Sequence, residues 1–260
     1  MTTILAIGYH GGIVMAGDTR ATGRAIETRN KITGLDDNVL MGCAGVTPYI
    51  ETLTSRMGEA FEIDETMTLW DRINKGLNSY LAEITERNKI SGLTLQEQRV
   101  NCYPEGILAV YDESYKQFEI FQFNLPDPCF EVGKHPAPLR ATVGSGSLAA
   151  TVFLKTAEQV LEEVEMTYDD LSETFAAQFS YLILKGVSLI DPYTSGFTFY
   201  RLDNRNYDFI DRREIFNAEG RELAEFLETA EKEIGKEPLL KVVTNRDLMG
   251  FFHSLGLSPF

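Results

Sequence analysis

The first residues of the chain contain two apolar runs separated by a short glycine-containing segment. Thr3–Tyr9 is rich in β-branched and apolar residues, His10–Gly12 supplies a turn, and Ile13–Gly17 continues as a second strand. Both faces of each predicted strand are largely apolar, whereas a strand with one solvated face alternates apolar and polar residues. The hairpin therefore predicts a sheet that is covered on both faces.

Groups of strands alternate with pairs of helices along the rest of the chain. Further strands are predicted at Lys31–Leu35, Val39–Ala44, Ile107–Asp112, Phe118–Phe123 and Gly196–Leu202. Helices are predicted at Pro48–Ile63, Met67–Lys89, Phe153–Val164 and Leu171–Gly186, the last one starting near a capping-box-like pair of Thr167 and Asp170. This order predicts an α+β fold: a four-layer αββα sandwich of two stacked, mainly antiparallel sheets flanked by helices.

The chain has 260 residues, of which 43% are hydrophobic, enough for one large domain or two small ones. We expect one domain over residues 2–215, with a polar loop or insertion at Ile90–Glu105 and an irregular crossing at Leu125–Leu139. Residues 216–260 are expected to be a C-terminal extension that packs on the same domain or on a neighbouring subunit. Ala218–Ile234 within it is a candidate charged helix.

Composition disfavours several classes of function. The net charge of -15 disfavours nucleic acid as a partner, because phosphate backbones select basic surfaces. Three cysteines (Cys43, Cys102 and Cys129) without a CxxC spacing disfavour a disulfide framework or a zinc site, so no metal or cofactor is expected. The sequence contains neither a signal-peptide-like start nor an apolar stretch of about 20 residues, so no membrane association and a cytoplasmic location are expected.

The histidines and glycine-rich segments offer few catalytic motifs. His10, His135 and His253 lie in no HExxH or HxE setting and near no GxSxG elbow, which disfavours zinc chemistry and a Ser-His-Asp triad. Gly144–Ser147 precedes a helix and could bind an anion, but it lacks the Lys-Ser/Thr ending of a phosphate-binding loop.

Thr2 is a small residue directly behind Met1. Removal of Met1 would leave Thr2 with a free α-amino group beside its hydroxyl, and such an amine can act as the base that activates the hydroxyl. The unperturbed pKa of an α-amino group is about 7.7–8.0, which suits a general base. On its own, however, a Met-Thr-Thr start is common and identifies nothing.

Short motifs follow this threonine in a fixed order. They are Ala16, Asp18, Arg20 and Thr22 within Gly11–Gly23, then Lys31-Ile32, Ala44-Gly45, Gly144–Ser147 before a helix, and Asp191 with Thr194. The set, from Thr2 to about Leu202, resembles the proteasome β-subunits and bacterial proteasome-like threonine peptidases, which are N-terminal nucleophile hydrolases. Thr194 stands where that family usually has serine, and the spacing from Asp18 to Lys31 is shorter than usual.

The resemblance implies a role for each matched residue. Thr2 would be the nucleophile, Lys31 would lower the cost of the alkoxide or relay its proton, and Asp18 would keep Lys31 charged and oriented. The Gly45 N–H would stabilise the oxyanion. The remaining residues would form a proton-shuttling network around Thr2 (Ser145, Asp191 and Thr194) or bind substrate (Ala21, Cys43 and Thr47), with the apolar floor at Cys43 favouring a hydrophobic residue before the cut.

The implied function is a threonine-type endopeptidase that acts on unfolded polypeptides or peptides, assembles into rings or spirals and works with a possible ATPase unfoldase. Two alternatives stay open: an N-terminal nucleophile amidase or peptide ligase with a defined substrate, and a non-catalytic ring subunit. Simpler roles also stay open for single residues. Asp18 and Lys31 could be an ordinary ion pair, Gly45 a packing glycine, and Ser145 a helix cap.

Overall fold

The opening hairpin forms the centre of a five-stranded sheet. The structure, a computed structural model, describes residues 2–22, 26–62, 67–92, 94, 102–126, 140–163, 167–191 and 194–210. β1 (Thr3–Tyr9) pairs antiparallel with β2 (Gly12–Asp18), and every residue of both strands is buried. The sheet has the order β11-β10-β2-β1-β9 and is completed by β9 (Arg140–Gly144), β10 (Phe197–Leu202) and β11 (Tyr207–Phe209).

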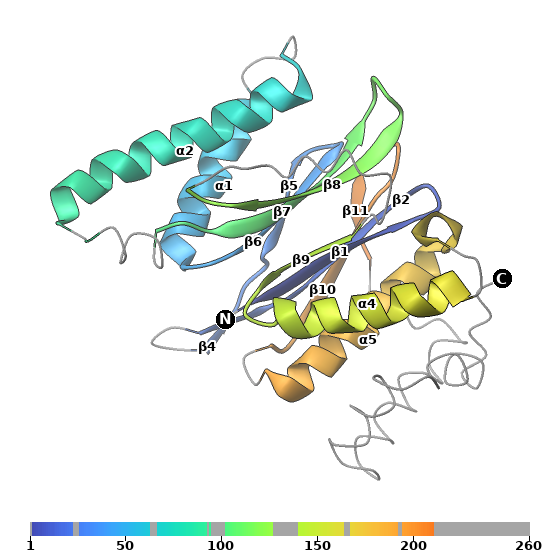
Figure 1. Cartoon of the computed structure of the whole chain (residues 1–260). Coiled ribbons are helices and arrows are strands. Elements are labelled where there is room, and N and C mark those ends of the chain that lie inside the picture. Colours follow the sequence, from blue (N-terminus) through green and yellow to red (C-terminus); the bar gives the residue numbers. More distant parts are fainter. Residues whose placement is uncertain are drawn as a thin grey trace.

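A second sheet of four strands stacks on the first. It has the order β5-β6-β7-β8 and consists of β5 (Ile32–Asp36), β6 (Val39–Ala44), β7 (Glu105–Asp112) and β8 (Gln117–Asn124), paired antiparallel. Helices α1 (Thr47–Glu62) and α2 (Leu69–Ser91) cover this sheet, whereas α4 (Ser147–Glu163) and α5 (Glu173–Ile190) cover the five-stranded one (Figure 1). The predicted α+β fold with two antiparallel sheets between helices is confirmed.

Three apolar layers explain why the hairpin is apolar on both faces. Leu5 and Ile7 of β1 pack with Leu154 of α4 and Leu184 of α5. Ile4 and Ala6, which alternate with them along β1, pack in the layer between the two sheets. This layer also contains Met15, Leu40, Ile107 and Ala109. A third cluster joins the outer face of the four-stranded sheet to α1 and α2. Side chains of β1 therefore alternate between two buried layers.

Four strands and one helix start differ from the prediction. The strands β3 (Arg20–Thr22), β4 (Ile26–Thr28), β9 and β11 were not predicted, and β3 and β4 form a separate two-stranded sheet. The predicted start of α5 was wrong: the Asp170 carboxylate accepts the Thr167 N–H at 2.7 Å and caps the 3₁₀ helix η1 (Tyr168–Asp170). Helix α5 is capped instead by Ser172, whose Oγ accepts the Phe175 N–H at 3.2 Å.

Several predicted segments lie wholly or largely outside the described residues. They are most of the loop at 90–105, the crossing from residue 127 to 139, and everything after residue 210, which includes the extension at 216–260 and its candidate helix. The start of the 90–105 segment is helical, because α2 continues to Ser91 and ends at Gly92 with a φ of 66°. Within the described residues, no helix combines the length and apolar character needed to cross a membrane.

Candidate active site

Thr2 lies directly before β1, at the end of the five-stranded sheet where β9 turns into α4. Thr2 is 6% exposed, and its backbone N–H donates a hydrogen bond of 3.2 Å to Ser145 Oγ. Because Met1 precedes Thr2, this nitrogen is a peptide amide. Cleavage of the bond before Thr2 would turn the same nitrogen into an α-amine with Ser145 as a neighbour.

A chain of hydroxyl and carboxylate groups extends from Ser145. Ser145 Oγ donates to Asp191 Oδ2 at 2.9 Å, and Thr194 Oγ1 donates to the same oxygen at 3.1 Å. Thr194 Oγ1 also lies 2.8 Å from Thr3 Oγ1. Since Thr194 gives its proton to Asp191, the Thr3 hydroxyl is the donor in that contact. The network thus connects the Thr2 nitrogen to Asp191, and the threonine at position 194 supplies the expected hydroxyl.

The turn that carries Ser145 is held from two sides. Gly144 pairs with Thr3 across β1 and β9, and its N–H donates to Glu105 Oε1 of β7 at 2.9 Å. Gly144 has a φ of 98°, and a Cβ at this position would overlap the carbonyl oxygen of Thr2. The turn therefore requires glycine both for its backbone conformation and for its approach to Thr2.

We expect Gly144→Ala to reduce both the thermal stability and any activity at Thr2. The left-handed backbone alone costs an alanine about 1–2 kcal/mol, and relief of the overlap must displace Thr2 or the turn. Thermal unfolding and activity measurements check this, with Gly58→Ala as the matched control, because a Cβ at Gly58 of α1 meets no neighbouring atom. An unchanged melting temperature would show that the turn tolerates a side chain.

Asp18 and Lys31 form a buried ion pair next to this site. Lys31 Nζ lies 2.8 Å from Asp18 Oδ2, and the side chains are 8% and 0% exposed. Lys31 Nζ also donates to the Arg20 carbonyl at 2.6 Å, and Asp18 Oδ1 accepts the Thr3 N–H at 2.6 Å. Asp18, at the end of β2, therefore orients Lys31 and also fixes the backbone next to Thr2.

Burial sets the direction of both pKa shifts in this pair. Loss of solvation lowers the pKa of the Lys31 amine, and the attraction of Asp18 opposes this shift. Burial likewise raises the pKa of the Asp18 carboxyl, against the effect of the Lys31 charge and its hydrogen bond. Each group therefore depends on the other for its charged form. A lysine with a lowered pKa suits either role expected of it, as a charge beside an alkoxide or as a proton relay.

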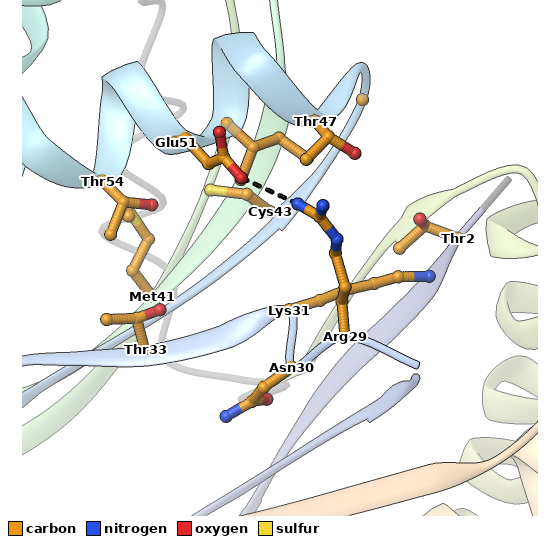
Figure 2. Close-up of a pocket in the computed structure, with 12 residues that line it drawn as sticks. Thr2, Arg29, Asn30, Lys31, Thr33, Met41, Cys43, Thr47, Glu51 and Thr54 are labelled. Carbon is orange, nitrogen blue, oxygen red and sulfur yellow. Dashed lines mark hydrogen bonds and ion pairs between the residues drawn. The ribbon is translucent and has the colours of Figure 1, made fainter. Parts of the chain in front are cut away.

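Thr2 and Lys31 line one cavity with a volume of about 240 Å³, and its other walls include residues of β5, β6 and α1. In Figure 2, the Lys31 side chain extends toward the side of the cavity where Thr2 lies. Gly45, which links β6 to α1, has a φ of 148°. The other lining residues are Arg29, Asn30, Thr33, Met41, Cys43, Gly45, Thr47, Ile50, Glu51 and Thr54.

Five of the ten site residues that the sequence predicted line the cavity. Cys43 and Thr47 line the cavity together with Gly45. Burial raises the pKa of the Cys43 thiol to about 12, so Cys43 is uncharged at neutral pH. Ala21 lies opposite Glu27 in the β3–β4 hairpin, and its side chain is outside the described part of the structure. The described residues contain no cluster of three or more potential metal ligands.

Sequence reasoning missed four residues around the site: Thr3, Glu105, Arg29 and Glu51. Thr3 acts through its backbone N–H and its hydroxyl, and only its position next to Thr2 could have drawn attention to it. Glu105 reaches Gly144 from the other sheet, at a distance of 39 positions in the sequence. Arg29 and Glu51 pair across the cavity and belong to no motif.

Comparison with protein families places the chain among known proteins. A family model described as Proteasome subunit matches residues 1–180. The chain belongs to the proteasome subunit family. Membership supports a hydrolase of the N-terminal nucleophile type in general and implies assembly into ring-like oligomers. The matched region includes Thr2, Asp18, Lys31, Gly45 and Ser145. Asp191 and Thr194 lie beyond it, and they are linked to the site by their hydrogen bonds.

Proposed function

We propose that this proteasome subunit is a threonine-type endopeptidase, with Thr2 as its N-terminal nucleophile once the bond to Met1 has been cleaved. One observation carries the proposal: the Thr2 nitrogen contacts Ser145 Oγ, while Thr2 and the buried Lys31 line the same cavity. An N-terminal amine can act as the base for a threonine hydroxyl, and a nearby lysine cation favours the alkoxide that forms.

In the first step, Thr2 Oγ attacks the carbonyl carbon of the substrate and transfers its proton to the Thr2 α-amine. Lys31 stabilises the developing alkoxide or relays the proton, and Asp18 keeps Lys31 in position. The Gly45 N–H donates to the oxyanion of the tetrahedral intermediate. This role is supported by the position of Gly45, which lines the same cavity as Thr2.

In the second step, the intermediate collapses. The amine returns its proton to the leaving nitrogen, the peptide bond breaks and an ester on Thr2 Oγ remains. Water then attacks the ester with the amine as base, which releases the new carboxylate and regenerates Thr2. Ser145, bonded to Asp191, accepts a hydrogen bond from the Thr2 nitrogen and so orients the base for both transfers.

The wider setting is part of the same proposal. Substrates are unfolded polypeptides or peptides that reach Thr2 inside a ring or an open spiral of identical subunits, with a possible ATPase unfoldase as partner and the cytoplasm as location. Residues 2–215 make up the hydrolase domain. The extension at 216–260 packs on this domain or on a neighbouring subunit.

The proposal predicts that an epoxyketone or β-lactone probe forms a single adduct on Thr2. Intact-mass analysis of the purified protein should show loss of Met1 and one added probe, which peptide mapping should locate on Thr2. Lys31→Ala should abolish labelling while the protein stays folded, since the hydroxyl then lacks its neighbouring cation. Lys89→Ala is the matched control, because it removes an exposed lysine on α2 and should label normally.

Two other results would support a different function. A protein that retains Met1, takes up no probe and cleaves no peptide would be a non-catalytic ring subunit. A protein that is labelled on Thr2 but turns over one defined amide, and leaves a loosely folded protein such as casein intact, would be an N-terminal nucleophile amidase or ligase. Degradation of the loosely folded protein supports the endopeptidase.

A further inference from the structure

Glu105 forms a hydrogen bond between the two stacked sheets, close to Thr2. Its Oε1 atom accepts the Gly144 N–H at 2.9 Å. Glu105 begins β7 of the four-stranded sheet, whereas Gly144 ends β9 of the five-stranded sheet (Figure 1). Because a hydrogen bond to a carboxylate is stronger than one between neutral groups, this contact can hold two backbone segments in a fixed relative position.

The strand register explains why Glu105 reaches the other sheet. Glu105 lies opposite Ala44 of β6, and directly opposite residues of paired strands face the same side of a sheet. Ala44 belongs to the apolar layer between the sheets, and so do Ile107 and Ala109, the next residues of β7 with the same orientation. Glu105 is therefore a half-buried carboxylate at the end of an apolar row that faces the five-stranded sheet.

On the four-stranded sheet, Glu105 adjoins the proposed oxyanion donor. Gly45 directly follows Ala44, the residue opposite Glu105. Gly45 also packs on Pro104, the residue directly before Glu105, because a Cβ at Gly45 would lie 3.2 Å from the Pro104 Cα. The backbone that positions the Gly45 N–H is thus in contact with the backbone that carries Glu105.

On the five-stranded sheet, the hydrogen bond of Glu105 ends next to the proposed nucleophile. Gly144 directly precedes Ser145, whose Oγ accepts the Thr2 N–H at 3.2 Å. The backbone of Gly144 is also packed closely on Thr2, since a Cβ at Gly144 would overlap the Thr2 carbonyl oxygen. The bond from Gly144 to Glu105 therefore connects the segment that holds Thr2 with the segment that holds Gly45.

We propose that Glu105 is a positioning residue that sets the distance between the Thr2 hydroxyl and the Gly45 N–H. The inference rests on the proposed peptidase activity, in which the hydroxyl is the nucleophile and the N–H stabilises the oxyanion. Both groups must meet the same substrate carbonyl, yet Thr2 precedes β1 of one sheet and Gly45 follows β6 of the other. A displacement of about 1 Å can lower a catalysed rate roughly a hundredfold.

The test compares two probes that react with the Thr2 hydroxyl in different ways. A β-lactone is attacked at its carbonyl carbon and passes through an oxyanion before the ring C–O bond breaks. A peptide vinyl sulfone takes up the hydroxyl at its carbon–carbon double bond, the proton ends on the adjacent carbon, and no carbonyl oxyanion forms. The ratio of the two labelling rates therefore reports on the oxyanion donor, whereas general damage to the fold slows both reactions.

Glu105→Met keeps the length of the side chain and removes the acceptor oxygen. It should slow labelling by the β-lactone about tenfold relative to labelling by the vinyl sulfone. Glu105→Gln keeps an acceptor oxygen for the Gly144 N–H and should retain the wild-type ratio. Glu119→Met is the matched control, because it removes a half-buried carboxylate that accepts a bond from Gln117 in the edge strand β8, and it should change neither rate.

A shorter side chain gives a second test if Glu105→Met folds poorly. Glu105→Asp keeps the carboxylate but is one methylene short of Gly144, so it should show the same selective loss of β-lactone labelling. An unchanged ratio in these two variants, equal slowing of both probes, or the same loss in Glu105→Gln would overturn the positioning role while wild-type Thr2 is still labelled. A wild-type protein without label on Thr2 would overturn this inference together with the proposed function.

Discussion

Thr2→Ala is expected to lose peptide hydrolysis by a factor of at least about a thousand and to stay folded. The substitution removes the only hydroxyl that the proposed mechanism uses as nucleophile, and loss of a nucleophile eliminates most of an enzyme's rate enhancement. Removal of one hydroxyl and one methyl from a residue that is 6% exposed should cost only about 1 kcal/mol of stability. Peptide turnover and thermal unfolding, measured on the same sample, separate the two effects.

A conservative variant and a control variant test the same role of Thr2. Thr2→Ser keeps a hydroxyl beside the α-amine, so it should still be labelled by the probe and should cleave peptides at a reduced rate. Thr85→Ala removes an exposed threonine on α2 whose hydroxyl bonds the Leu81 carbonyl, and it should behave as wild type. Turnover by Thr2→Ala comparable to that of Thr85→Ala would mean that the hydrolysis does not use Thr2.

The architecture could be predicted because it depends on long, strongly patterned segments. β1 and β2 are apolar at consecutive positions, which is a signal of burial on both faces, and α1 and α5 have helical spacing over many turns. Three of the four missed strands, β3, β4 and β11, have three residues each, fewer than a period-two pattern needs. The fourth, β9, has five residues and directly follows the segment that was predicted as an irregular crossing. The misplaced start of α5 has a different cause: the Thr167–Asp170 pattern caps an α-helix or a 3₁₀ helix equally well.

The residue types of the site could be predicted, but some of its contacts could not. The order of Thr2, Asp18, Lys31 and Ser145 in the sequence predicted one common site. The structure brings these residues together, although their catalytic roles stay predictions. The hydrogen bond from the Thr3 N–H to Asp18 could not be predicted, because every residue except proline carries that donor. Arg29 and Glu51, 22 positions apart, become partners only when α1 packs over β5.

The buried pair of Asp18 and Lys31 should show strong coupling in a double-mutant cycle. Asp18→Asn and Lys31→Met each leave one buried group without its counterion, and we expect each to cost about 3–5 kcal/mol of unfolding free energy. The double variant has no buried charge and should recover most of this loss. Urea unfolding measures all three. Probe labelling should remain absent whenever Lys31 is replaced, so stability and activity separate in the double variant.

The two single variants should also differ in the sign of their pH dependence. Without Asp18, burial lowers the pKa of Lys31 further, so the unfolded state binds more protons and the deficit of Asp18→Asn should shrink as the pH rises from 7 toward about 10. Without Lys31, the raised pKa of Asp18 means that the folded state binds more protons. The deficit of Lys31→Met should therefore shrink as the pH falls from 7 toward about 4. Parallel pH profiles for the two variants, or a double variant no more stable than either, would contradict a buried charge pair at the centre of the site.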